Sequence, residues 1–285
     1  MKPDQRFQSL PKSFWASVRT IGEKLGYTVR GKGIVKVPTV EDFTGGLNSL
    51  ELSPTYLVSA RGEPTELGRT LLDYLAFRAD VLNRYVEPRL MDASEAKRQF
   101  RRLKTSLKTS CPLPMNKQKG SKKAEAYFTC IINMLIEANA KGFGCDYDPR
   151  RLTTFTRDGI PLRTLARRVD GAFPGAVNPV AIWEIKEYYY TTTFGSRVAD
   201  GIYETLLDGM ELEELRQHED VDVKHYLMVD AHYTWWDCGK SYLCRIVDML
   251  HMGYVDEVLF GREVLDELPR IVGEWTKSIA TKKGR

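Results

Sequence analysis

Three residues in the second half of the chain have the types and spacing needed for metal-dependent phosphate chemistry. Glu184 and Lys186 lie two positions apart, and Asp170 precedes Glu184 by fourteen positions. Two carboxylates can hold a hard cation such as Mg²⁺, which lowers the pKa of a water that attacks a phosphodiester. A neighbouring lysine can orient that water or offset charge in the transition state. We therefore expect these three residues to be catalytic, with Mg²⁺ held by Asp170, Glu184 and the carbonyl of Ile185.

The apolar segment 180–190 is predicted to be the strand that positions two of these residues. Side chains alternate along a strand, so Glu184 and Lys186 share one face. Trp183 and Ile185 then point to the other face, into the core. A carboxylate and an ammonium group in a buried strand are costly unless a metal, partner or substrate compensates them.

A second strand is predicted over 165–173, with Asp170 near its end. If the two strands form an antiparallel pair, Asp170 can approach Glu184 across the ladder. In the alternative interpretation, Glu184, Lys186 and Glu187 only form surface ion pairs on an exposed edge strand.

The residues after Gly120 alternate between helical and strand patterns, which predicts a mixed sheet covered by helices on both faces. Apolar periodicity predicts helices over 121–138, 199–215, 240–252 and 262–279, and further strands over 152–155, 224–231 and 255–260. Earlier helices are predicted over 12–25, 39–52, 65–85 and 94–107, the last capped by Ser94. We therefore expect an α/β protein with a mainly helical N-terminal region, 1–110, for DNA recognition, and a catalytic core, 111–285.

This arrangement resembles the PD-(D/E)xK nuclease superfamily, and within it the type II restriction endonucleases. Asp170 matches the first acidic residue of the family's motif, and Glu184 and Lys186 match the acidic residue and lysine of its second half. Val169 stands where the family's name has proline. The resemblance covers about residues 120–262 and implies a restriction-endonuclease-like core with a mixed β-sheet flanked by helices.

The same resemblance suggests a further acidic residue, because family members often carry one on the helix before the first strand. Glu125 and Glu137 are the candidates. Glu125 is favoured as a fourth catalytic residue, since it lies near the start of the predicted helix 121–138. In the alternative interpretation, Glu125 only complements the helix dipole.

A stretch of basic residues without any acidic residue lies around the start of the predicted core. Between Lys97 and Lys123 there are ten basic residues and no acidic one. Such a run favours contact with a polyanion, although a merely solvated surface is the alternative. The segment after the strand 180–190 adds aromatic, hydroxyl and guanidinium groups that can contact phosphate or base edges. The DNA-binding candidates are Arg101, Arg102, Lys104, Lys119, Lys122, Tyr190, Thr192, Ser196 and Arg197.

Composition narrows the class of protein. No apolar run approaches the roughly 20 residues needed to cross a bilayer, and residues 1–10 lack the apolar core of a signal peptide. We therefore expect a cytoplasmic protein with no membrane partner. The five cysteines are odd in number and lack CxxC spacing, so neither a disulfide framework nor a structural zinc site is predicted.

Together these features favour a type II restriction endonuclease that cuts a short sequence in double-stranded DNA. A homodimer is expected, because cutting both strands with one site per chain requires two chains. Two alternatives remain open. One is a structure-specific or repair nuclease of the same superfamily, and the other is a DNA-binding protein without nuclease activity.

Overall fold

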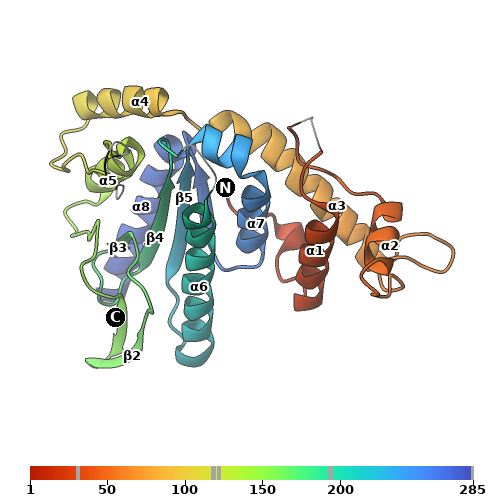
Figure 1. Cartoon of the computed structure of the whole chain (residues 1–285). Coiled ribbons are helices and arrows are strands. Elements are labelled where there is room, and N and C mark those ends of the chain that lie inside the picture. The colour runs from red at the N-terminus through yellow and green to blue at the C-terminus, as the bar shows by residue number, and fades with distance from the viewer. Residues whose placement is uncertain (30–32, 117–119, 121–122, 192–194, 284–285) are drawn as a thin grey trace.

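A computed structural model describes residues 1–29, 33–116, 120, 123–191 and 195–283, apart from the side chains of Arg197, Lys282 and Lys283. Within these residues the chain has a mixed α/β fold (Figure 1). The helices are α1 (Lys12–Leu25), α2 (Val40–Asn48), α3 (Glu66–Asp80), α4 (Ala93–Ser106), α5 (Tyr127–Asn139), α6 (Ser196–Glu219), α7 (Lys240–His251) and α8 (Glu263–Lys283). The strands are β1 (Thr154–Arg157), β2 (Ile160–Thr164), β3 (Gly171–Phe173), β4 (Ala181–Glu187), β5 (Lys224–Asp230) and β6 (Glu257–Phe260).

The main sheet has the strand order β3-β4-β5-β6 in the described part of the chain. β3 is antiparallel to β4, while β4, β5 and β6 run parallel to one another. Gly171 of β3 pairs with Trp183 of β4, and Glu184 of β4 pairs with Leu227 of β5. β1 and β2 form a separate antiparallel hairpin. The prediction of a mixed sheet is therefore confirmed, and so is the antiparallel pairing of the two strands that carry the candidate residues.

Helices cover both faces of this sheet, as the alternating pattern predicted. α5 and α8 pack on one face, where the Trp183 ring stacks on Trp275 with centroids 5.4 Å apart. α6 and α7 pack on the opposite face, against Leu227 and Val229. Figure 1 shows α6 and α7 on one side of the strands and α5 and α8 on the other. The even-numbered positions of β4, which include Glu184 and Lys186, therefore face α6.

The N-terminal helices α1, α2 and α3 form a core of their own beside α7 (Figure 1). A buried ion pair joins this core to the sheet. The Arg78 guanidinium on α3 donates to both carboxylate oxygens of Asp248 on α7, at 2.8 and 2.9 Å. The Tyr74 hydroxyl donates to the same carboxylate at 2.6 Å. Since these side chains are buried, their pairing fixes how α3 docks on α7.

His251 at the end of α7 provides a second contact between these two parts. Its Nδ1 lies 2.7 Å from the Val247 carbonyl, and its Nε2 accepts from the Asp4 amide at 3.1 Å. Burial lowers the pKa of His251. The neutral ring satisfies both contacts, whereas a proton on Nε2 would remove the acceptor for Asp4. The rings of Phe7, Tyr74 and Phe77 surround the imidazole edge to face.

We predict that the protein loses stability as the pH falls below about 6.5, the ordinary pKa of histidine. Below that pH the unfolded chain binds a proton at His251 that the folded chain does not, so acid favours unfolding. Urea unfolding at pH 7.5 and 5.5 measures the change. His251→Gln should show a smaller fall than the wild type, while His218→Gln, at an exposed position, should not. Equal falls in the wild type and His251→Gln would contradict this assignment.

The predicted strand over 165–173 is wrong in length, because β3 contains only Gly171–Phe173. The backbone before it pairs elsewhere. Leu165 donates its amide to Thr153, and the Ala166 amide donates to the Glu211 carboxylate on α6 at 3.0 Å. Asp170 therefore lies immediately before the strand and not near its end. The register is unaffected, so Asp170 still lies opposite Glu184.

Two predicted helix starts are also wrong. α4 is capped by Asp92 and not by Ser94, since the Asp92 carboxylate accepts from the Glu95 amide at 2.7 Å. The helix predicted from residue 121 begins only at Tyr127. The residues before it pair with an earlier extended segment, where the Ala126 amide donates to the Pro114 carbonyl at 2.9 Å.

α4 packs its apolar side on α5. Ala96, Phe100 and Leu103 belong to the same core cluster as Phe128 of α5. The basic residues of α4 therefore face away from the core. The division of the chain at residue 110 into two regions stays a prediction. In the described ranges, the structure contains no helix with the length and apolar character needed to cross a membrane.

Candidate functional site

The structure brings Asp170, Glu184 and Lys186 together on the face of the sheet that α6 covers. The Asp170 amide donates to Glu184 Oε1 at 3.1 Å, and the Ile185 amide donates to Asp170 Oδ2 at 3.0 Å. Lys186 Nζ donates to Glu184 Oε2 at 2.7 Å. Strand parity and the antiparallel register predicted this meeting. The alternative of an exposed surface pair is wrong for Glu184 and Lys186, whose side chains are only 0% and 6% exposed.

Two glycines allow this close approach. A Cβ at Gly171 would lie 2.1 Å from the Trp183 ring, so only glycine fits between Asp170 and the core. A Cβ at Gly201 on α6 would lie 3.2 Å from the Lys186 side chain and 2.9 Å from the Tyr188 hydroxyl oxygen. Glycine at this position therefore lets α6 pack directly on the lysine.

Opposing effects set the charge states here. Burial favours the neutral form of Glu184, but the nearby cations Lys186 and Arg167 outweigh it and lower the Glu184 pKa. Burial also disfavours the charged form of Lys186, yet Glu184 and Asp170 outweigh it and raise the Lys186 pKa. Both residues are thus charged near neutral pH. Lys186 is a cation in this arrangement and not a free base.

Three further charged residues join the cluster, and the sequence pattern did not single them out. Arg167 Nη1 lies 2.9 Å from Glu184 Oε1 and 2.5 Å from Asp208 Oδ2, and its Nη2 lies 3.4 Å from Glu204 Oε2. Lys186 Nζ also lies 3.4 Å from Glu204 Oε2. Burial and the neighbouring Glu184 raise the pKa of Asp208 to about 8. The i, i+4 spacing of Glu204 and Asp208 on one helix face was the available signal.

The donor set suits a hard dication in chemistry and charge. Asp170 and Glu184 supply carboxylate oxygens, and with Glu204 these acidic groups outnumber the two cationic side chains among them. In its present arrangement, however, Arg167 contacts both oxygens of Glu184. Consistent with this, the described residues contain no group of three or more His, Cys, Asp or Glu side chains arranged to hold a metal. A metal at Asp170 and Glu184 therefore requires Arg167 to release Glu184.

Ile185, whose carbonyl was a candidate metal ligand, lies between the two charged residues of β4. Its side chain packs on the opposite face, against the core under α5 and α8. Its amide is already bonded to Asp170. The residue thus fixes the Asp170 carboxylate, and metal ligation by its carbonyl stays a prediction.

Glu125 lies outside this cluster in all the contacts that the structure gives it. It is exposed, precedes α5, and accepts from the Tyr127 hydroxyl. A different carboxylate caps α5. Glu187 at the end of β4 accepts from the Phe128 amide at 3.2 Å and from the Thr129 amide at 2.9 Å. The dipole-complementing position expected for Glu125 is therefore taken by Glu187, and a catalytic role for Glu125 stays a prediction.

The DNA-binding candidates on α4 lie on the solvent-exposed side of the helix. Arg101, Arg102 and Lys104 are exposed, as is Ser196 at the start of α6, whereas Tyr190 is half-buried. Lys119, Lys122 and Thr192 lie outside the described residues, as does the side chain of Arg197.

The beginning of α4 contacts the beginning of α5 through a small polar cluster. Lys97 Nζ lies 5.5 Å from the centroid of the Tyr127 ring, and the Tyr127 hydroxyl donates to Glu125. The basic helix α4 therefore contacts the same end of α5 that Glu187, at the end of β4, caps.

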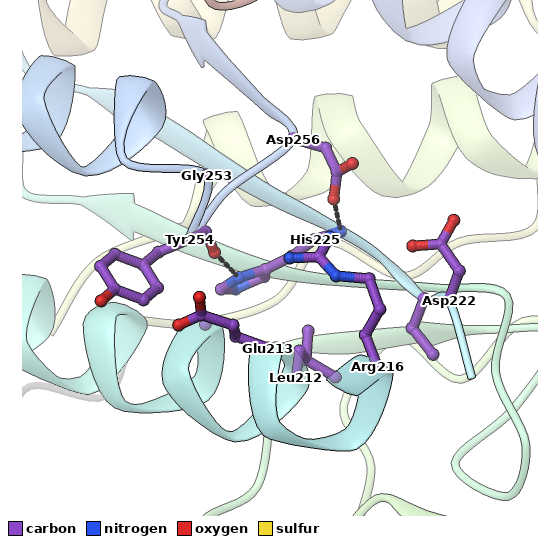
Figure 2. Close-up of a pocket in the computed structure, with 10 residues that line it drawn as sticks. Leu212, Glu213, Arg216, Asp222, His225, Gly253, Tyr254 and Asp256 are labelled. Carbon is purple, nitrogen blue, oxygen red and sulfur yellow. Dashed lines mark hydrogen bonds between the residues drawn. The ribbon is translucent and has the colours of Figure 1, made fainter. Parts of the chain in front are cut away.

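A separate polar cavity lies between α6 and the loop after α7 (Figure 2). His225 Nδ1 lies 2.8 Å from the Tyr254 carbonyl, and the His225 amide donates to Asp256 Oδ2 at 2.9 Å. His225 Nε2 is buried without a hydrogen-bond partner in the described part of the chain. The cavity measures about 10 Å³, which is room for one water. It is lined by none of Asp170, Glu184 or Lys186.

Comparison with known proteins gives two family matches. The family "Domain of unknown function (DUF7690)" matches residues 1–85, which contain α1, α2 and α3. The family "Domain of unknown function (DUF7687)" matches residues 91–275, which contain α4, the sheet and the whole charged cluster. No curated protein and no solved structure matches the chain. Because residues 91–275 are more than half of the sequence, the chain belongs to the DUF7687 family.

Proposed function

We propose that this protein is a Mg²⁺-dependent nuclease that hydrolyses phosphodiester bonds in double-stranded DNA, acting as a type II restriction endonuclease. The observation that carries the proposal is the convergence of Asp170, Glu184 and Lys186 on one face of the sheet. This is the set of groups that the resemblance to the PD-(D/E)xK superfamily implies. A buried carboxylate and ammonium group are expensive to maintain for stability alone, which favours a chemical role.

Each residue has a distinct task in this proposal. Asp170 and Glu184 would hold the metal, with the Ile185 carbonyl as a further oxygen ligand. When bound, Mg²⁺ polarises the scissile phosphate and lowers the pKa of a nearby water. Lys186 is protonated, so it orients that water and stabilises negative charge developing on the phosphate. Its ion pair with Glu184 keeps the ammonium group beside the metal ligands.

The basic face of α4 supports the choice of DNA as the substrate. Its exposed arginines and lysines can neutralise backbone phosphates. Lys97 of α4 contacts Tyr127 at the start of α5, the helix that Glu187 at the end of β4 caps. We propose that DNA lies across α4 and enters the site beside Tyr190 and Ser196. A homodimer would cut both strands of a palindromic sequence, and such an enzyme would act in the cytoplasm.

Cleavage of phage DNA tests the proposal and separates its alternatives. The protein is incubated with the DNA in the presence of excess MgCl₂, with EDTA as the metal-free control. A restriction enzyme gives discrete fragments, whereas a repair or structure-specific nuclease gives a smear or cuts only branched substrates. Lys186→Ala should abolish either pattern. Binding of DNA without any Mg²⁺-dependent cleavage would overturn the nuclease proposal and favour a non-catalytic DNA-binding protein.

A further inference from the structure

Arg167 occupies the position that the proposed metal would need. Its guanidinium contacts both oxygens of Glu184, Oε1 at 2.9 Å through Nη1 and Oε2 at 3.1 Å through Nη2. Glu184 Oε1 also accepts from the Asp170 amide, and Oε2 from Lys186. With four donors on two oxygens, this carboxylate has its acceptor positions filled. A cation cannot bind Glu184 unless one of these donors leaves.

Arg167 is the donor best placed to leave. The Asp170 amide is part of the backbone next to β3, and Lys186 is buried two residues from Glu184 on the same strand. Arg167 comes instead from the connection between β2 and β3, and its side chain is 22% exposed. Of the two cationic donors it is the more exposed, since the Lys186 side chain is only 6% exposed.

Two acidic side chains on α6 already contact the guanidinium and can keep it paired when it moves. Asp208 Oδ2 is already 2.5 Å from Arg167 Nη1, and its other oxygen, Oδ1, is buried without a hydrogen-bond partner among the described residues. Glu204 Oε2 lies 3.4 Å from Arg167 Nη2 and its side chain is 46% exposed. Arg167 can therefore exchange Glu184 for a closer contact with Glu204 while it keeps its contact with Asp208, so that it stays paired with a carboxylate.

We infer that Arg167 is a positioning residue that closes the metal site in the metal-free protein, and that Mg²⁺ binding displaces it from Glu184 onto Glu204 and Asp208. The inference rests on the proposed function, because it concerns the metal proposed there. Arg167 and the metal compete for one carboxylate, so each weakens the binding of the other by the same factor. Removal of Arg167 should therefore tighten metal binding.

The test is Mn²⁺ binding in the absence of DNA, measured by electron paramagnetic resonance of the free ion. We expect Arg167→Ala to bind Mn²⁺ about tenfold more tightly than the wild type, which corresponds to losing roughly one competing contact. Arg167→Lys, which keeps a cation but cannot contact both oxygens, should fall between them. Arg163→Ala is the matched control, because Arg163 also pairs with α6 carboxylates, Glu211 and Glu214, at similar exposure. It should bind Mn²⁺ like the wild type.

If Arg167→Ala is less stable than the wild type, the melting temperature measured with and without Mn²⁺ provides a second test of metal binding. Mn²⁺ should then raise its melting temperature by more than it raises that of the wild type. Equal or weaker Mn²⁺ binding by Arg167→Ala, or no binding by any of the proteins, would overturn the inference. The proposed function fails in a different way. Tighter Mn²⁺ binding without DNA cleavage would keep the inference and exclude the nuclease, while cleavage with unchanged binding would do the reverse.

Discussion

Replacement of Asp170 by asparagine is expected to slow Mg²⁺-dependent DNA cleavage by about a thousandfold, which corresponds to roughly 4 kcal/mol of transition-state stabilisation. Asparagine has nearly the same shape, and its side-chain oxygen can still accept from the Ile185 amide that now donates to Asp170. What it loses is the negative charge that would hold the metal beside Glu184. Single-turnover cleavage of a plasmid, with enzyme in excess, measures the chemical step directly.

Asp158→Asn is the control for this substitution. Asp158 lies in the turn between β1 and β2 with φ of 53°, a conformation that asparagine accepts. Its cleavage rate should equal that of the wild type. If Asp170→Asn cut DNA at the same rate as this control, Asp170 would have no part in the chemistry. That result would leave the roles of Glu184 and Lys186 untested.

The largest effect on stability is expected from Arg78→Met, which should lower the free energy of unfolding by about 3–5 kcal/mol. Methionine is apolar and has nearly the length of arginine, so it fills the same space. It leaves the carboxylate of Asp248 buried without its cation. Arg78 and Asp248 are 3% and 6% exposed in their side chains, so water cannot replace the lost partner. Because the pair joins α3 to α7, the N-terminal helices should also become more sensitive to proteolysis. Urea unfolding followed by tryptophan fluorescence gives the free energy.

An exposed ion pair provides the matched comparison. Arg84 pairs with Asp80 at 3.0 Å, but its side chain is 82% exposed, so Arg84→Met should cost less than about 1 kcal/mol. The double variant Arg78→Met with Asp248→Leu should regain part of the loss, because both buried charges are then removed. A cost for Arg78→Met no greater than that for Arg84→Met would show that the pair does not hold the two parts together.

The central part of the site could be predicted from sequence because it depends on local geometry. Strand parity alone puts Glu184 and Lys186 on one face of β4. One antiparallel pairing then brings in Asp170. The strand boundaries were less accurate, yet this did not matter, since a pairing register survives the loss of residues at a strand end. The mixed sheet with helices on both faces could also be predicted, because segments with helical spacing of apolar residues alternate along the chain with strand-like segments.

The rest of the cluster depends on tertiary packing that no local pattern specifies. Arg167 lies in an irregular connection whose course is set by bonds to α6. Glu204 and Asp208 meet it only because Gly201 lets α6 approach β4 closely. The interpretation of Glu125 shows the same limit. The start of α5 was misplaced because pairing with residues near Pro114 overrides the helical pattern before Tyr127.

The position of a bound Mn²⁺ ion tests the central claim most directly. Crystals of the protein soaked in MnCl₂ would locate the ion by its anomalous scattering. We predict a peak between the carboxylates of Asp170 and Glu184, within coordination distance of both and beside Lys186, with the Arg167 guanidinium moved toward Asp208. An ion bound elsewhere, with Glu184 still held by Arg167 in a protein that cleaves DNA, would contradict the account.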